Sequence, residues 1–257
     1  MTTCIPVLLY HSVNDRPAAG DGRWTVSPRD FASHIDAITA SGRSAMRITE
    51  IAAVLRGERP LPPRPVAITF DDGFSDTYDA VAALLAQDLV STIYITTAEV
   101  GSRDRLSTAQ LAEIAQHTSV EVGAHAVRHR RLDELDGRTL AAEVGGSKVQ
   151  LEALLQNRVW SFAYPHGAYD RVVRQAVVDA GYRSAAAVKN ALSHDGDDPF
   201  AVARWTVTAD TPAARIAAVL DGAGVPLAWA HERLRTRAYR MARRSRRRVT
   251  PSVGMPS

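Results

Sequence analysis

The sequence has a single cysteine, Cys4, among its 257 residues. One cysteine excludes an internal disulfide framework and every zinc site that is built from several cysteine ligands. Any metal bound by this protein must therefore be held by histidine and carboxylate side chains.

Long hydrophobic runs are also missing. The N-terminal stretch MTTCIPVLLYHS lacks a basic segment before its apolar residues, and Pro6 interrupts them, so the stretch does not look like a signal peptide. No later stretch is apolar over the roughly 20 residues that a membrane-spanning helix needs. We therefore expect a cytoplasmic protein.

Acidic residues are absent from the stretch 233–248, which contains nine arginines. The whole chain has a formal net charge of +3, so subtracting these nine charges leaves −6 for the rest. Apolar residues such as Leu234 and Tyr239 lie between the arginines, and a basic amphipathic helix of this kind can lie on anionic lipid. We expect either peripheral contact with an anionic membrane or a solvated, frayed helix. Nothing else in the sequence supports nucleic-acid binding.

Short apolar and β-branched runs alternate with segments of helical periodicity along most of the chain. This order is typical of parallel strands covered by helices, so the predicted fold class is α/β. We expect a single domain over residues 1–222, followed by a basic, partly helical appendage over residues 223–257. The expected strands are PVLLY, SAMRIT, PVAITF, STIYIT, SVEVGAH, VWSFAYP, RSAAAV and VARWTV.

Two of the expected helices carry clear N-terminal signals. SPRDFASHIDAITASG offers Ser27 as the N-cap and Pro28 as the first helical residue. STAQLAEIAQ opens with Ser107 and Gln110 at the spacing of a capping box. We expect these helices to support the fold rather than to take part in chemistry.

The strongest chemical signal is the stretch VAITFDDGFSDTYDAV. An apolar strand ends in Asp71 and Asp72, and Gly73 then lets the chain turn towards a helix that begins near Asp76. Reactive groups gather at the carboxyl ends of parallel strands, so two adjacent carboxylates there suggest one metal ligand and one base. The alternative is a structural turn in which Asp71 caps the helix.

A histidine pair follows another apolar strand, in VEVGAHAVRHRRL. His125 and His129 are four residues apart, so within one helical turn both imidazoles would face the same way and could bind one ion. Together with one carboxylate they would leave coordination positions open for water. A pair at this spacing is also common as ordinary surface residues, and only the aspartate pair makes it a candidate site.

The third element is FAYPHGAYD, in which a strand ends at Tyr164 and a rigid turn follows at Pro165 and Gly167. Such a turn can direct a backbone N–H into a pocket. An ordinary proline–glycine turn would have the same sequence, so this motif gains its meaning from the other two.

In the order TFDDG, then His125 and His129 with Leu132, then FAYPHGAYD, these motifs resemble the polysaccharide deacetylases with a NodB homology domain, also called carbohydrate esterase family four. The resemblance covers about Pro6 to Val207. It implies a distorted (β/α) barrel that holds one divalent metal, usually zinc, with cobalt or nickel as alternatives. It also implies an enzyme that removes N-acetyl groups from amino sugars.

The resemblance also assigns roles to residues. Asp71 corresponds to the catalytic base, and the metal ligands are Asp72, His125 and His129. The turn at Pro165 and His166 corresponds to the part that presents a backbone N–H to the oxyanion. Tyr164, just before it, is placed with the substrate or oxyanion residues, where it could line a sugar cleft; the alternative is a core position. In the implied mechanism Asp71 takes a proton from water as that water attacks the acetamide carbonyl.

A general acid must then protonate the leaving amine. Many members of the family use a histidine in a late Leu-x-His motif, but the late histidine here, His231, lies in the basic appendage. A subgroup resembling the deacetylases of poly-N-acetylglucosamine has this histidine in an N-terminal Tyr-His sequence. VLLYHSV fits that pattern, so we predict His11 as the acid and His231 as the alternative.

The sequence departs from the family pattern at two positions. Ala126 stands where a serine or threonine usually follows the first histidine, which removes a hydroxyl that could brace the loop. Ala163 stands where many relatives carry an arginine that tethers the base. Arg204, in VARWTV, is predicted to orient Asp71 in its place, on the substrate side of the site.

The predicted function is therefore metal-dependent removal of acetyl groups from an N-acetylated sugar in a polysaccharide, glycolipid or glycoside. Two alternatives stay open: a metal-dependent amidase that acts on a non-sugar C–N bond, and a non-catalytic carbohydrate-binding relative. The oligomeric state, the sugar and its chain length are not readable from the sequence, because loop shapes determine substrate choice.

Overall fold

The computed structural model describes residues 2–229 of the chain. Its centre is a closed ring of seven parallel strands, in which β2 pairs with both β12 and β6. In spatial order the ring consists of β2 (Val7–Tyr10), β12 (Val202–Thr206), β10 (Ser184–Val188), β9 (Ser161–Ala163), β8 (Val120–Ala124), β7 (Ser91–Ile95) and β6 (Pro65–Phe70). The predicted distorted (β/α) barrel is confirmed.

Short strands extend or flank this barrel. Strand β5 (Ser44–Ala45) adds to β6 in parallel. Strand β1 (Cys4–Ile5) pairs antiparallel with β11 (Ser193–His194), and β3 (Ser12–Val13) pairs with β4 (Thr25–Val26). Every apolar run that was expected to form a strand contributes to one. Most residues of the barrel strands are buried, as parallel strands covered by helices require, whereas both residues of β5 are half-buried.

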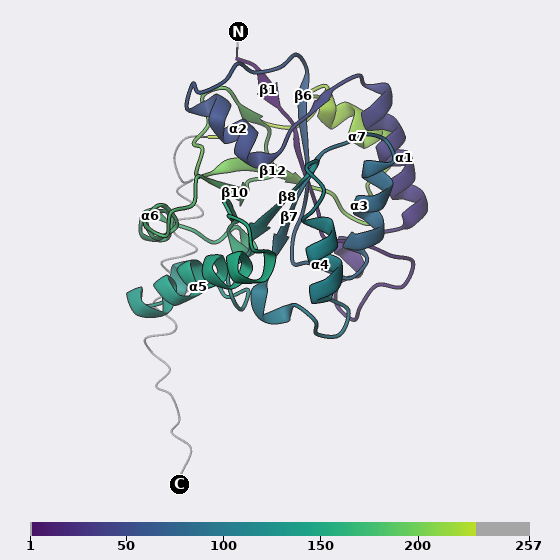
Figure 1. Ribbon diagram of the computed structural model, residues 1–257. Helices are drawn as coiled ribbons and strands as arrows, with labels where there is room; N and C mark the ends of the chain where they lie inside the picture. Colours follow the sequence, from purple (N-terminus) through teal and green to yellow (C-terminus); the bar gives the residue numbers. More distant parts are fainter. Residues whose placement is uncertain (1, 230–257) are drawn as a thin grey trace, which may run out of the picture.

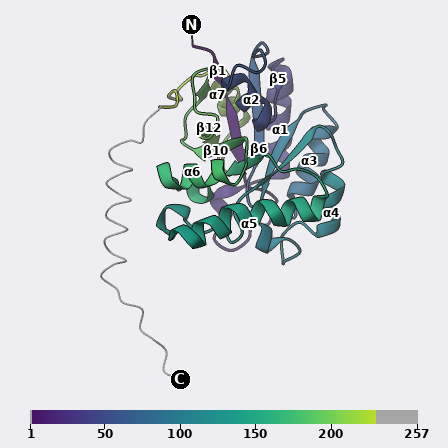
Figure 2. The same cartoon turned by 60° about the vertical axis from the view of Figure 1, so that its left-hand side comes forward.

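Seven α-helices of the described residues surround the strands (Figures 1 and 2). They are α1 (Pro28–Ala40), α2 (Ile48–Leu55), α3 (Thr77–Leu85), α4 (Thr108–Ile114), α5 (Gly137–Leu155), α6 (Arg171–Asp179) and α7 (Ala213–Leu220). Four short 3-10 turns connect them: η1 (Gly22–Trp24), η2 (Thr97–Glu99), η3 (Leu132–Glu134) and η4 (Pro165–Gly167). None of the helices within residues 2–229 is long and apolar enough to cross a membrane.

The predicted helix starts are confirmed. The Ser27 hydroxyl accepts a hydrogen bond from the Asp30 N–H at the start of α1, and Pro28 is the first helical residue. Ser107 and Gln110 form a reciprocal capping box at the start of α4. In both helices the serine hydroxyl accepts from an N–H group of the first turn that would otherwise lack a partner.

Two apolar clusters hold the barrel together. One fills the barrel and joins α2 to it, since Ile48 and Ile51 are buried with Val7, Ala67 and other strand residues. The larger cluster lies between the strands and the surrounding helices. With α2 covering the starts of the strands, the carboxyl ends of the strands are left to carry a site.

The predicted appendage is described only up to residue 229. Leu227 forms a β-bridge with Leu192, and Ala228 is buried, so this part of the chain packs against the barrel domain. The arginine-rich stretch, its predicted membrane contact and His231 lie outside the described residues. The boundary at residue 222 stays a prediction.

Candidate functional site

The two aspartates lie at the carboxyl end of β6, where all six strand residues are buried. Asp72 and Gly73 both have positive φ angles, 73° and 72°, and this left-handed pair turns the chain out of the barrel. The N-cap of α3 is Asp76, so Asp71 does not cap that helix and the structural alternative for it is wrong. Asp71 is only 2% exposed, and a buried carboxylate of this kind needs a partner.

Arg204 is that partner. Its Nη1 and Nη2 donate to Asp71 Oδ1 and Oδ2 at 2.6 and 2.8 Å, the bidentate geometry that guanidinium and carboxylate groups favour. Arg204 is fully buried, and its guanidinium also lies 5.3 Å from the centre of the Tyr94 ring. The predicted contact with Asp71 is confirmed. A side chain this buried does not reach a substrate, so Arg204 acts through Asp71 and its place among the substrate-side residues was wrong.

The charge state of Asp71 follows from these neighbours. Burial raises the pKa of Asp71, but the charge of Arg204, together with His125 and His11, outweighs burial and lowers this pKa to about 2. Asp71 is therefore an ionised carboxylate at neutral pH, which is the form that can accept a proton.

Asp72, His125 and His129 form the cluster that could hold a metal ion. One ligand atom from each residue lies within 4.8 Å of the other two. The Nε2 atoms of His125 and His129 are 3.5 and 3.2 Å from Asp72 Oδ1. This buried oxygen has no hydrogen-bond partner among the described residues. An acceptor that two imidazole nitrogens approach without a hydrogen bond is well suited to a shared cation.

The tautomer of His125 supports this assignment. Its Nδ1 lies 2.8 Å from the carbonyl oxygen of Ala163. A carbonyl only accepts, so Nδ1 carries the proton and Nε2 presents its lone pair towards Asp72. Burial lowers the pKa of His125 to about 3, which keeps the ring neutral. Burial raises the pKa of Asp72 to about 6, against the opposing effect of His11, and a bound cation would favour its ionised form.

The histidine pair does not lie in a helical turn as expected. Ala126 and His129 have left-handed φ angles of 62° and 50°, so the two histidines belong to an irregular loop after β8. Their rings nevertheless come together, with centroids 4.9 Å apart. The buried Glu143 of α5 braces this loop, since its Oε2 accepts from the N–H groups of Val127 and Arg128 at 3.0 and 2.8 Å.

Glu143 therefore braces the loop in a chain whose Ala126 has no hydroxyl to do so. Glu143 was not predicted, because it lies 16 residues along the chain from Val127 and no local pattern links the two. Once the loop is known to lie against α5, a fully buried glutamate in that helix identifies itself as a loop anchor.

His11 follows β2 directly, and the carbonyl of Tyr10 accepts from the Asp71 N–H at 3.0 Å. Because Tyr10 pairs with Phe70, the residues that follow them, His11 and Asp71, occupy neighbouring positions at the ends of two adjacent strands. The Nδ1 of His11 has no partner among the described residues. His34 shows the contrasting case of a satisfied core histidine, bonded to the Tyr10 hydroxyl and to a backbone carbonyl.

The segment after His11 is fixed by Asp76, which the sequence analysis named only as a helix start. Asp76 Oδ2 accepts from the Ser12 hydroxyl at 2.7 Å, and Oδ1 accepts from the Val13 N–H at 3.1 Å. The same stretch that supplies Asp71 and Asp72 thus anchors the chain beside His11. No pattern in the sequence predicts this contact, because its partners are more than 60 residues apart.

The third motif forms η4, in which His166 has a φ angle of 58°. Tyr164 is buried, its hydroxyl donates to the Phe200 carbonyl, and its N–H donates to the Ala186 carbonyl. The prediction that Tyr164 serves the substrate or the oxyanion was therefore wrong, because its side chain and N–H both serve the fold. Pro165 is buried and has no N–H of its own.

His166 is the residue of this motif that reaches the site. Its ring centroid lies 4.4 Å from that of His129, and its Nε2 lies 3.2 Å from the His129 carbonyl oxygen. The structure thus brings together His11, Asp71, Asp72, His125 and His129 with His166 beside them. The oxyanion role of the turn stays a prediction.

Comparisons with known proteins agree with this arrangement. A family profile described as polysaccharide deacetylase matches residues 58–185, which include both aspartates, both histidines and the third motif. The chain belongs to the polysaccharide deacetylase family. YxkH of Bacillus subtilis (strain 168), which is assigned to the same family, is 26% identical over 180 residues, or 70% of this chain. That match spans 62% of the length of the Bacillus subtilis protein.

Solved structures of family members share the fold. The Streptococcus pyogenes deacetylase PplD, determined in complex with acetate, superposes with a TM-score of 0.77 at 21% identity, over 84% of this chain and 97% of that one. BC0361, a polysaccharide deacetylase from Bacillus cereus, superposes with a TM-score of 0.75 at 23% identity, over 85% and 69% of the two chains. At these identities the likeness establishes the barrel architecture.

Proposed function

We propose that this chain is a metal-dependent hydrolase that removes acetyl groups from an N-acetylated amino sugar in a polysaccharide, glycolipid or glycoside. The observation that carries the proposal is the convergence of the His125 and His129 Nε2 atoms on Asp72 Oδ1, next to the ionised Asp71. Family membership supports the reaction class, and the site supplies the groups that the reaction needs.

The residues present fit one divalent metal ion, with zinc as the first choice because two imidazoles and one carboxylate suit it. Asp72, His125 and His129 would hold the ion. When bound, it would acidify a water molecule and polarise the acetamide oxygen.

The other steps belong to residues of this chain. Asp71 Oδ2 lies 3.7 Å from His125 Nε2, so the carboxylate faces the ligand atoms and accepts the proton of the attacking water. Arg204 holds this carboxylate in one orientation. His11, which neighbours Asp71 at the ends of two adjacent strands, donates a proton to the amine as the C–N bond breaks, which yields acetate and a free amino sugar.

A substrate panel tests the proposed function. The zinc-loaded protein is incubated with N-acetylglucosamine oligomers, a simple N-acetylated sugar and non-sugar acetamides, and released acetate is measured. We expect acetate from the sugars. Acetate from the non-sugar amides alone would support the amidase alternative, and sugar binding without turnover would support the non-catalytic one.

Replacing a proposed ligand should abolish metal binding. In His125→Gln we expect zinc affinity to fall by more than about 100-fold, because loss of even an outer partner of a metal ligand commonly costs about 10–100-fold. Competition with a chromophoric chelator measures this affinity. His117→Gln, which changes an exposed histidine, is the matched control. Equal zinc affinity in the two variants would refute the ligand assignment.

The role of His11 is tested by the leaving group. In His11→Ala we expect the rate on an N-acetylated sugar to fall by about 10²–10⁴-fold, because the amine then leaves without a proton donor. Hydrolysis of 4-nitrophenyl acetate should change far less, since its leaving group needs no protonation. His231→Ala serves as the parallel variant for the alternative acid. An equal loss on both substrates, or a loss confined to His231→Ala, would remove His11 from this role.

A further inference from the structure

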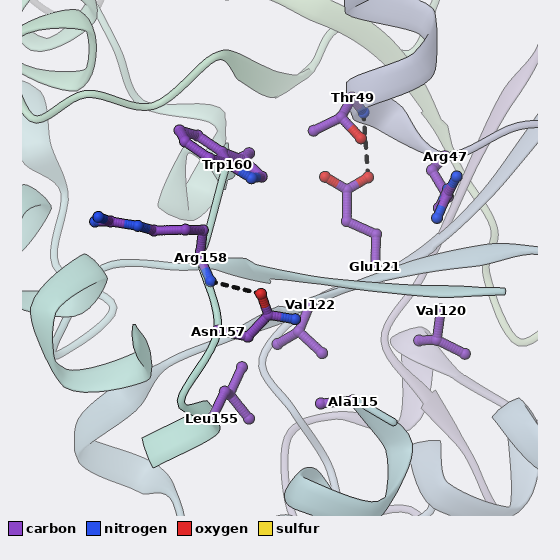
Figure 3. Close-up of a pocket in the computed structure, with 10 residues that line it drawn as sticks. All are labelled: Arg47, Thr49, Ala115, Val120, Glu121, Val122, Leu155, Asn157, Arg158 and Trp160. Carbon is purple, nitrogen blue, oxygen red and sulfur yellow. Dashed lines mark hydrogen bonds between the residues drawn. The ribbon is translucent and has the colours of Figure 1, made fainter. Parts of the chain in front are cut away.

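A second pocket, whose lining residues are drawn in Figure 3, lies near the start of β8, whereas the proposed metal ligands lie beyond the carboxyl ends of the strands. Glu121, near the start of β8, contributes to it, whereas His125 follows the end of the same strand. Four residues of strand separate them by about 13 Å. A sugar unit in this pocket would therefore not be the one at the reaction site.

The pocket has one unsatisfied acceptor. Glu121 Oε2 accepts from the Thr49 N–H and from the Thr92 hydroxyl, both at 3.1 Å. Its Oε1 is buried and has no partner among the described residues. Figure 3 shows this carboxylate pointing into the pocket. Burial raises the pKa of Glu121, and the hydrogen bonds from Thr49 and Thr92 oppose this effect only in part.

Donors face this oxygen across the pocket. In Figure 3 the nitrogen-bearing edge of the Trp160 indole is turned towards Glu121, and no hydrogen bond joins them. Trp160 is 40% exposed, which is high for so large an apolar side chain. Asn157 uses its Oδ1 to accept from the Arg158 N–H at 2.8 Å, so its amide nitrogen is left as a donor.

The charged groups around the pocket favour neither a cationic nor an anionic ligand. Arg47 is already bound to Glu50 and to the Thr118 carbonyl. The Arg158 side chain extends away from Glu121. Lys148 and Arg183 lie 5.1 and 5.4 Å from the Trp160 ring centre, so an ammonium group would meet cations there. An anion, in turn, would meet the Glu121 carboxylate.

A hydroxyl group satisfies both sides, because it donates to Glu121 Oε1 and accepts from the Trp160 or Asn157 N–H. The pocket volume is about 150 Å³, which is room for a single six-membered ring. Apolar side chains that could contact the C–H face of such a ring form the remaining wall: Ala115, Val120, Val122 and Leu155.

We propose that this pocket binds one neutral pyranose unit through its hydroxyl groups and so forms a carbohydrate subsite separate from the reaction site. The choice of a polymer containing N-acetylglucosamine as its probe rests on the proposed function. The hydroxyl recognition itself rests on Glu121, Asn157 and Trp160.

Indole N–H signals in a two-dimensional NMR titration test the proposal. The chain has four tryptophans, so each reports its own surroundings. Trp24 lies 5.5 Å from His11 and reports the reaction site, whereas Trp160 reports the second pocket. Trp24→Phe, Trp160→Phe and Trp229→Phe assign three of the four signals, and the remaining signal belongs to Trp205. The metal-loaded full chain, carrying Asp71→Asn to prevent turnover, is titrated with the N-acetylglucosamine hexamer, its de-N-acetylated form and oligogalacturonate.

We expect the neutral hexamer to shift the Trp160 signal and to do so at lower concentration than either charged oligomer. Glu121→Gln should weaken this response about tenfold, because its amide would turn a second donor towards the indole. Trp160→Phe should weaken hexamer binding by a similar factor in calorimetry, while Trp229→Phe should not.

Two results would overturn the subsite. One is a Trp160 signal that stays fixed while the Trp24 signal reaches saturation, which would leave only solvent in the pocket. The other is a stronger response to the cationic or anionic oligomer. If the Trp160 signal responds in this variant but the zinc-loaded wild-type protein releases no acetate from any substrate of the panel, the subsite stands and the proposed function fails.

Discussion

Replacing Arg204 by methionine is expected to lower the free energy of unfolding by about 3–5 kcal/mol, the usual effect of leaving one member of a buried ion pair without its partner. Both side chains of the pair are almost completely buried, at 0% and 3% exposure, so solvent cannot compensate Asp71. Methionine fills similar volume, which limits the loss of packing. Denaturant unfolding of the variant and of wild type, both without metal, measures the difference in the free energy of unfolding.

Arg174→Met is the matched control, because Arg174 also binds an aspartate, Asp198, with two hydrogen bonds of 2.7 and 2.8 Å. That pair is about one third exposed, so its loss should cost no more than about 1 kcal/mol. If both variants lose a similar amount of unfolding free energy, burial does not determine how much the Arg204–Asp71 pair stabilises the fold.

The same substitution should change the pH dependence. Arg204 holds the pKa of Asp71 at about 2, against the effect of burial. In wild type the stabilisation from this ionised carboxylate is present above the unfolded pKa of about 4 and is lost as the pH falls towards 2. Without Arg204, burial is less opposed and the pKa rises, so the acid limb of the rate profile should move to higher pH.

Replacing Asp71 by asparagine should lower kcat by about 10²–10⁴-fold, because the proposed proton acceptor is lost while the side-chain shape is kept. Zinc stoichiometry should stay the same, since Asp72, His125 and His129 are unchanged. Released acetate and bound zinc are measured on the same samples.

Asp71→Asn also leaves Arg204 buried without a counter-charge, so a loss of activity could reflect instability alone. The double variant Asp71→Asn with Arg204→Met separates the two effects. It should recover much of the stability that either single variant loses, since both charges are removed together. It should recover none of the activity. Wild-type turnover in a stable, zinc-loaded double variant would exclude Asp71 as the base.

The sequence was sufficient to predict what depends on local pattern. The strands follow from short apolar runs, the helix starts follow from Ser27 and Ser107, and the ends of two strands placed Asp71 and His125 at one edge of the barrel. The contact between Arg204 and Asp71 was also predicted, although their separation of 133 residues made it an inference from the family pattern.

The features of the site that could not be predicted depend on tertiary contacts. Glu143 and Asp76 brace the site from other elements, and no periodicity marks them. The two histidines keep their predicted proximity through left-handed turns at Ala126 and His129, which a helical spacing rule does not describe. The motif alone allowed Tyr164 to line a sugar cleft or to lie in the core, and its hydrogen bonds to the Phe200 and Ala186 carbonyls show the core position.

The central claim is that one divalent metal, held by Asp72, His125 and His129, makes this chain a deacetylase. The most direct measurement follows metal content and acetate release from N-acetylglucosamine oligomers on one sample, before chelation, after chelation and after zinc is restored. The site predicts close to one metal ion per chain, no acetate release after chelation, and recovery in proportion to the zinc taken up. Full acetate release from metal-free protein would contradict it.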